Sequence, residues 1–97
     1  MITALLELRI APESLSDATR VLTETLQQTR AREGNLGVDV LVDRADAAHI
    51  TIVERWESIE ADDAYRAWRA TDEGKSQLGT ILAAPPALSV NDTSFSL

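Results

Sequence analysis

Apolar and polar positions alternate along the first ten residues of the chain. Every even position is apolar, whereas the odd positions between them include Glu7 and Arg9. A period of two is typical of a β-strand with one buried face. Similar alternation recurs over 36–42 and 49–56. The polar segment Arg44–Ala48 between these two stretches predicts a turn, and therefore a hairpin.

Apolar residues at helical spacing predict one helix before this hairpin and another after it. The first helix can be capped by Ser14 or Ser16, and it should end near Arg32, just before Gly34. The second helix can be capped by Ser58. Its apolar stripe, which should face the sheet, is expected to consist of Ala61, Ala64, Tyr65 and Trp68.

The last quarter of the chain has a weaker pattern. A short helix is expected to restart at Thr71-Asp72 and to end before Pro85-Pro86, because proline cannot continue a helix. A final, more polar strand is expected over 87–97.

The resulting order, β-α-β-β-α-β, predicts a ferredoxin-like α+β fold. We expect residues 1–97 to form a single domain with a four-stranded antiparallel sheet and both helices on one face. The opposite face is expected to carry an apolar patch formed by Leu5, Leu41, Val53 and either Phe95 or Leu97. Packing on a second copy would bury such a patch, so the pattern predicts a homodimer.

Composition narrows the choice of partners. The 97 residues include no cysteine, which excludes disulfides, thiolate metal sites and cysteine nucleophiles. A net charge of −7 disfavours nucleic acid and anionic membranes as partners, since both attract basic surfaces. The first ten residues lack the basic start of a signal peptide, so a soluble cytoplasmic protein is expected. A core this small is marginal, which again favours a dimer.

Three of the four aromatic residues lie close together, at Trp56, Tyr65 and Trp68. Rings at helical spacing are often core residues, but they can equally line a pocket for a flat ligand. Trp56 is expected in the core, at the end of its strand.

Three polar features are candidates for chemistry. Glu54 lies on the apolar face of its strand, where a carboxylate is either part of a site or paired with an arginine, here Arg9 or an arginine of the second helix. His49 is the only histidine of the chain and a candidate base, although it could simply be exposed. The acidic residues at the start of the second helix are expected to be solvated, and they comprise Glu57, Glu60, Asp62 and Asp63.

The stretch REGNLGVDVLVDRADAAHITIVERW, followed by SIEADDAYRAWRATDEG, resembles the antibiotic biosynthesis monooxygenase (ABM) family. Three features carry the resemblance, which covers nearly the whole chain: Glu33-Gly34-Asn35-Leu36, the Glu54-x-Trp56 strand end, and a helix followed by a Thr-Asp break. The resemblance implies that chains pair into a dimeric α+β barrel, each with a pocket between sheet and helices. Some members oxidise polycyclic phenols to quinones with O2 and no cofactor, others degrade haem, and many have no assigned substrate.

The sequence departs from the family pattern on the second helix, where many members have a histidine and this chain has Trp68. The haem-degrading branch also needs an asparagine and an axial histidine, whose matching positions here are Leu8 and Leu78. Haem degradation is therefore disfavoured, and we expect no metal, flavin or haem cofactor.

Two hypotheses remain open. The first is a cofactor-free monooxygenase acting on a small aromatic or polyketide-like substrate with O2. His49 or Glu54 would be its base, with Tyr65, Trp68 and Arg69 binding the substrate. The alternative is a non-catalytic dimeric barrel that binds a small metabolite.

Overall fold

The computed structural model describes residues 1–97 and contains four strands, two α-helices and two short 3₁₀ helices. The strands are β1 (Ile2–Arg9), β2 (Asn35–Asp43), β3 (Asp46–Trp56) and β4 (Ala87–Asp92). The α-helices are α1 (Leu15–Arg30) and α2 (Ile59–Arg69), and the 3₁₀ helices are η1 (Pro12–Ser14) and η2 (Leu78–Ile81). No helix is long and apolar enough to cross a membrane.

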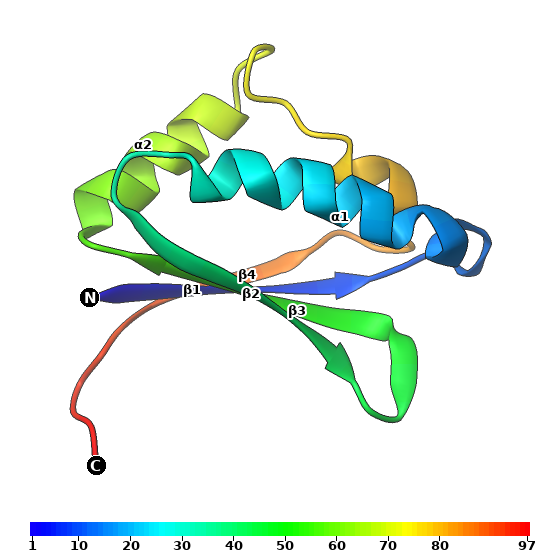
Figure 1. The fold of residues 1–97 in the computed structure, drawn as a ribbon, viewed down its shortest axis with the longest axis horizontal. Coiled ribbons are helices and arrows are strands. Elements are labelled where there is room, and N and C mark those ends of the chain that lie inside the picture. Colours follow the sequence, from blue (N-terminus) through cyan, green and yellow to red (C-terminus); the bar gives the residue numbers. More distant parts are fainter.

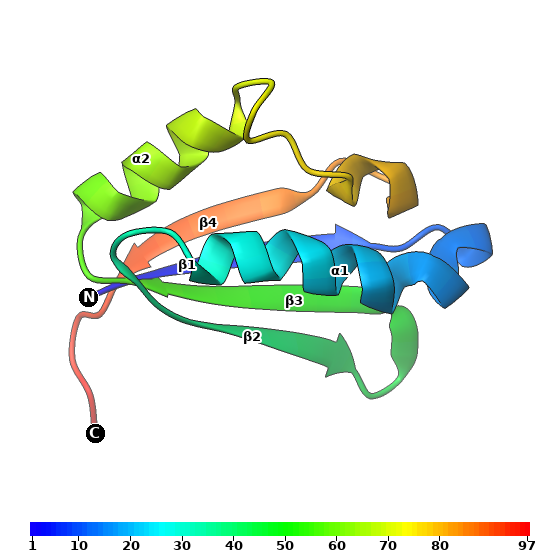
Figure 2. The same ribbon diagram turned by 45° about the horizontal axis from the view of Figure 1, so that its top comes forward.

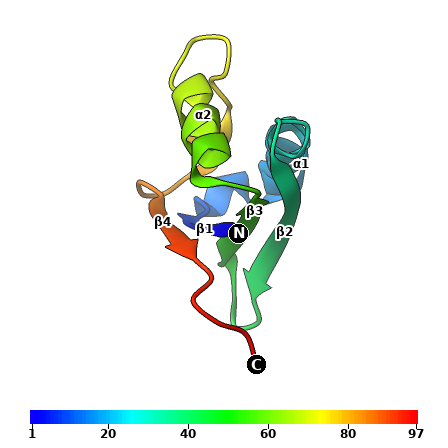
Figure 3. The same ribbon diagram turned by 90° about the vertical axis from the view of Figure 1, so that its left-hand side faces the viewer.

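The four strands form one antiparallel sheet in the order β2-β3-β1-β4. Both helices lie on the same face of this sheet (Figures 1 and 2). Seen end on, α1 lies towards β2, whereas α2 lies towards β4 (Figure 3). The ferredoxin-like α+β fold that the sequence predicted is therefore confirmed.

Strand register separates the residues of β3 into two sets. Ile52 pairs with Leu6, and Trp56 pairs with Ile2, so these side chains share the face covered by the helices. The main core lies between this face and α1, and its buried side chains are Leu8, Ile10, Ala18, Val21, Leu22, Ile50, Ile52 and Ile81. A smaller cluster, formed by Ile2, Ala4, Trp56 and Tyr65, lies under α2. Trp56 is fully buried there, as expected.

The hairpin between β2 and β3 is tighter than the sequence indicated. Asp43 pairs with Asp46, which leaves only Arg44 and Ala45 in the turn. The side chain of Asp43 accepts a hydrogen bond from the backbone N–H of Ala45 at 2.8 Å, so local polar contacts close the turn early. The expected five-residue turn was therefore too long, and β3 begins three residues before His49.

Two further expectations about the end of the chain were wrong. The segment after α2 does not restart a helix at Thr71, because the hydroxyl of Thr71 bonds the carbonyl of Trp68 at 2.6 Å and closes a turn instead. Only the 3₁₀ turn η2 follows. Strand β4 ends at Asp92, so Phe95 and Leu97 lie beyond the sheet and are exposed.

The face of the sheet without helices is partly apolar. Leu5 and Val53 pair across β1 and β3 at its centre and are half-buried, while Leu41 of β2 is exposed. The C-terminal segment after β4 leaves the sheet on this helix-free side (Figure 1).

Candidate functional site

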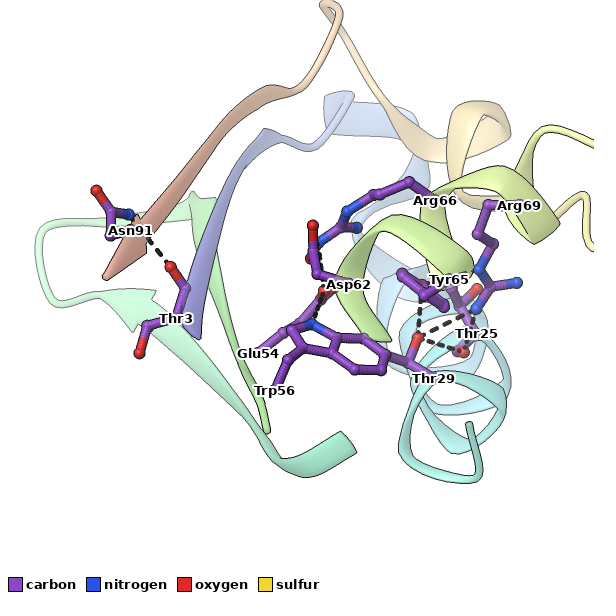
Figure 4. A network of polar contacts seen from close by, with 10 residues as sticks. All are labelled: Thr3, Thr25, Thr29, Glu54, Trp56, Asp62, Tyr65, Arg66, Arg69 and Asn91. Carbon is purple, nitrogen blue, oxygen red and sulfur yellow. Dashed lines mark hydrogen bonds and ion pairs between the residues drawn. The ribbon is translucent and has the colours of Figure 1, made fainter. Parts of the chain in front are cut away.

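A buried ion pair joins the centre of the sheet to α2. Glu54 of β3 is only 1 % exposed, and its Oε1 accepts a hydrogen bond from Nη2 of Arg66 at 2.7 Å. The indole Nε1 of Trp56 donates to the same oxygen at 3.3 Å (Figure 4). Both donors end on Oε1, and no protein donor reaches the second oxygen, Oε2. Glu54 is therefore paired with an arginine of α2, and not with Arg9, which pairs with Asp46.

Asp62 belongs to the same ion-pair cluster, which corrects its expected place among the solvated acids. It is 2 % exposed, and its Oδ1 accepts from Nη2 of Arg66 at 3.1 Å. One guanidinium therefore faces two buried carboxylates (Figure 4). Burial of Asp62 is tolerated because the cation that already pairs with Glu54 lies one helical turn away.

The buried stripe of α2 is consequently rotated from the expected one. Ala64 is exposed and Trp68 is only half-buried, whereas Asp62 and Tyr65 are buried. The stripe predicted from the apolar residues was wrong because Asp62, a polar residue, is also buried, paired with Arg66.

A second network joins α2 to α1 through Arg69. Its Nε donates to the Tyr65 hydroxyl at 2.8 Å, and its Nη2 donates to the carbonyl of Thr25 at 2.8 Å and the hydroxyl of Thr29 at 3.1 Å. Its Nη1 donates to Gln28 at 2.8 Å and to the carbonyl of Gly74 at 3.1 Å. Every N–H group of Arg69 therefore has a partner within the protein.

The Tyr65 hydroxyl is held by the same network, because it also shares a 2.8 Å hydrogen bond with Thr29. Thr29 is fully buried; its position at helical spacing with Leu22 and Leu26 predicts that it faces the sheet, but not that it belongs to this network. The signal that could have found it is a hydroxyl residue on the buried stripe of α1, where an unpaired hydroxyl would be costly.

A cavity of about 170 Å³ lies between the sheet and the two helices. Its walls include the apolar side chains of Leu6, Leu22 and Ile52 together with the polar residues of both networks, Glu54, Tyr65, Arg66 and Arg69. The Nε atom of Arg66 is buried and has no hydrogen-bond partner. The cavity therefore combines an apolar interior with a carboxylate and a guanidinium that are only partly paired within the protein, since both of their mutual contacts use Nη2 of Arg66 and Oε1 of Glu54 or Oδ1 of Asp62.

Trp68 does not line this cavity, although its neighbour Tyr65 does. Two guanidinium groups lie over its ring, with Cζ of Arg32 at 4.3 Å and Cζ of Arg69 at 4.8 Å from the ring centroid. Gly74 packs so closely against Trp68 that a Cβ atom on residue 74 would overlap the Trp68 carbonyl. Trp68 thus covers the outer side of the Arg69 network.

His49 lies on the helix-free face of the sheet, opposite Glu54. It pairs with Arg9 in the register of β1 and β3, and its Nδ1 is 3.1 Å from Oδ2 of Asp43. Its Nε2 is 3.7 Å from Oε1 of Glu7. The hydrogen bonds from the Ala45 N–H and from His49 lower the pKa of Asp43 below its ordinary value. The two candidate bases, His49 and Glu54, therefore do not belong to one site.

The described side chains contain no group of three or more His, Cys, Asp or Glu residues that could hold a metal ion.

Comparisons with known proteins agree with this fold. The family model described as antibiotic biosynthesis monooxygenase matches residues 1–76. No curated protein sequence matches significantly.

Several solved structures have the same fold. An antibiotic biosynthesis monooxygenase is 21 % identical, with a TM-score of 0.80 over 95 % of this chain and 97 % of that one. The protein Rv0793 from Mycobacterium tuberculosis is 20 % identical, with a TM-score of 0.80 over 98 % and 96 % of the two chains. A Deinococcus radiodurans protein provisionally named an antibiotic biosynthesis monooxygenase is 18 % identical, with a TM-score of 0.84 over 100 % and 96 %.

Identities this low show a shared fold and no more, whereas the family model covers most of the chain. The chain therefore belongs to the antibiotic biosynthesis monooxygenase family.

Proposed function

We propose that this protein is a monooxygenase that needs no cofactor and oxidises a small phenol or quinol with O2 in the cavity between the sheet and the helices. The observation that carries the proposal is the pair of unused polar atoms in its wall. Glu54 offers Oε2 as an acceptor, and Arg66 offers Nη1 as a donor, next to apolar side chains, because the hydrogen bonds of Arg66 within the protein use only Nη2.

The chemistry follows from these two atoms. Oε2 of Glu54 takes the phenolic proton, and Nη1 of Arg66 donates to the oxyanion that forms. The electron-rich anion then passes an electron to O2, so the substrate itself supplies the reducing electrons. For a hydroquinone, one oxygen atom enters the ring and the other leaves as water, giving a hydroxyquinone. The apolar walls keep bulk water from the anion.

The volume of the cavity limits the size of the substrate. A cavity of about 150 Å³ in another protein binds benzene, and this one measures about 170 Å³. A single substituted ring fits such a volume, whereas a three-ring anthrone requires the walls to move. We therefore favour a single-ring substrate.

The other predicted site residues have supporting roles in this proposal. Tyr65 and Arg69 form part of the cavity wall, and their side chains are oriented by Thr29. Trp68 protects that network from solvent. His49 remains a second candidate base, but a substrate reaching it would bind on the helix-free face.

We also propose that two copies pair through the helix-free face of the sheet. Leu5 and Val53 at its centre and Leu41 at its edge form the apolar part of this face, and both helices cover the other side. Pairing would remove this apolar surface from water.

One observation favours the alternative, a small-molecule binder without catalysis. The Tyr65 hydroxyl and all N–H groups of Arg69 are already used within the protein, so they have no free group for a reacting substrate. Of the charged residues in the cavity wall, Glu54 and Arg66 keep polar atoms that no protein group uses.

The test measures O2 consumption by the purified protein with a series of hydroquinones, naphthols and anthrones, alongside calorimetric binding of each compound. We expect turnover of single-ring hydroquinones, and we expect Glu54→Gln to lower kcat by about 10²–10⁴-fold, the usual contribution of a general base. Glu60→Gln, on the exposed side of α2, is the matched control and should retain activity. His49→Gln examines the second candidate base.

The outcomes separate the two functions. Full activity in folded Glu54→Gln would exclude Glu54 as the base. Binding of a ring compound without any O2 consumption would support the binder instead.

A further inference from the structure

A groove much larger than the cavity runs along the other side of α1, over β2. Its volume is about 830 Å³. Side chains from Leu15 to Arg30, at the two ends of α1, form one wall. The 16 residues of this helix span about 24 Å at about 1.5 Å per residue. The groove is therefore long enough for an extended chain molecule.

The opposite wall consists of β2, which is an edge strand of the sheet. Val38, Val40 and Val42 face the same side as α1, since they pair with Glu54, Ile52 and Ile50 of β3. Val40 is 44 % exposed and Val42 is 54 % exposed. Aliphatic side chains therefore line most of the groove while remaining open to solvent.

The two ends of the groove differ in polarity. Leu15 and Val42 lie at one end, where the lining is apolar. Arg30 and Arg55 lie at the other, near the start of β2, where Nη1 of Arg30 donates to the Asn35 carbonyl at 3.0 Å.

Only one of these arginines is neutralised. Arg55 pairs with Asp39 at 2.6 Å, whereas Arg30 has no carboxylate partner. In a chain of net charge −7, this end of the groove carries a net positive charge.

We propose that the α1–β2 groove binds a linear amphiphile with an anionic head, such as a long-chain carboxylate. Arg30 pairs with the carboxylate, and the alkyl chain lies between α1 and β2 towards Leu15 and Val42. Aliphatic walls without aromatic rings suit a flexible alkyl chain better than a flat ligand. This site is distinct from the cavity of the Glu54–Arg66 pair, which lies between the two helices and the sheet.

Calorimetric titration with saturated carboxylates from octanoate to tetradecanoate, each below its micelle concentration, tests the proposal. Dodecanol and dodecyltrimethylammonium are the matched neutral and cationic ligands. We expect Kd to fall by up to about fourfold for each added methylene, which corresponds to about 0.8 kcal/mol per buried CH₂. Dodecanoate should bind more tightly than either matched ligand.

Three variants locate the site. Arg30→Gln should weaken dodecanoate binding by about 1.5- to fivefold, which corresponds to about 0.2–1 kcal/mol for an exposed ion pair, and should leave dodecanol unchanged. Val40→Gln should weaken both ligands. Arg20→Gln is the control, because Arg20 is exposed on α1 outside the groove, paired with Glu24.

Three results would overturn the proposal. Equal binding of the carboxylate and the trimethylammonium ligand would remove the role of Arg30. Identical behaviour of Arg30→Gln and Arg20→Gln would place the ligand elsewhere. A change of oligomeric state in Val40→Gln, with no change in ligand affinity, would show that the groove is a protein interface.

Discussion

Replacing Arg66 by leucine tests whether the Glu54–Arg66–Asp62 cluster behaves as a buried ion pair. The side chains of Glu54 and Asp62 are 2 % and 3 % exposed, and Arg66 is the cation that pairs with both. Without it, two buried carboxylates lose their counter-charge. Removing one partner of a buried ion pair typically costs about 3–5 kcal/mol. A domain of this size has a total stability of about 5–15 kcal/mol, so Arg66→Leu should be close to unfolding.

Urea denaturation followed by tryptophan fluorescence measures this loss, at one fixed protein concentration because association would add to the apparent stability. The control is Arg20→Leu, which removes an exposed pair with Glu24 at 3.5 Å and should change the free energy of unfolding by less than about 1 kcal/mol.

Adding Glu54→Gln and Asp62→Asn to Arg66→Leu should restore part of the stability, because it removes both unpaired charges. A loss below about 1 kcal/mol for Arg66→Leu would refute the reasoning, since it would mean that water already reaches the carboxylates.

Three further outcomes are expected. Trp56→Ala should cost about 3–5 kcal/mol as a fully buried core substitution. Trp68→Ala should cost distinctly less, because Trp68 is only half-buried and packs against the edge of the smaller core cluster. Equal losses in urea denaturation would contradict this. The lowered pKa of Asp43 stabilises the fold above the unfolded-state pKa, and this contribution disappears as pH falls through the folded-state pKa. Asp43→Asn should therefore reduce the difference in unfolding free energy between neutral and acidic pH. Val53→Lys should dissociate the proposed dimer in sedimentation experiments at micromolar concentration, and a wild-type monomer there would exclude the dimer.

The sequence alone determined the order of the four strands and two α-helices and the faces that β1, β2 and β3 present. A period of two in β1 and β3, and helical spacing in α1 and α2, depend on neighbouring residues, so they can be read locally. The separation of His49 from Glu54 could also have been read this way, since odd and even residues of one strand point to opposite faces. The predicted ends of elements were wrong where a single side-chain contact decides them, as at Asp43 in the hairpin and at Thr71 after α2.

The tertiary structure decided which polar side chains are buried and which hydrogen-bond or ion-pair partners they have. Asp62 looks like an ordinary first-turn acid, and only the position of Arg66 over Glu54 makes its burial favourable. Thr29 and Tyr65 are distant in sequence, yet their hydroxyls bond across α1 and α2. The cavity and the α1–β2 groove likewise depend on how the two helices lie on the sheet. The Asp62–Arg66 contact is an i,i+4 pair that the sequence alone indicates, but the contacts of Arg66 with Glu54 and of Thr29 with Tyr65 depend on long-range packing, which neighbouring residues in the chain do not specify.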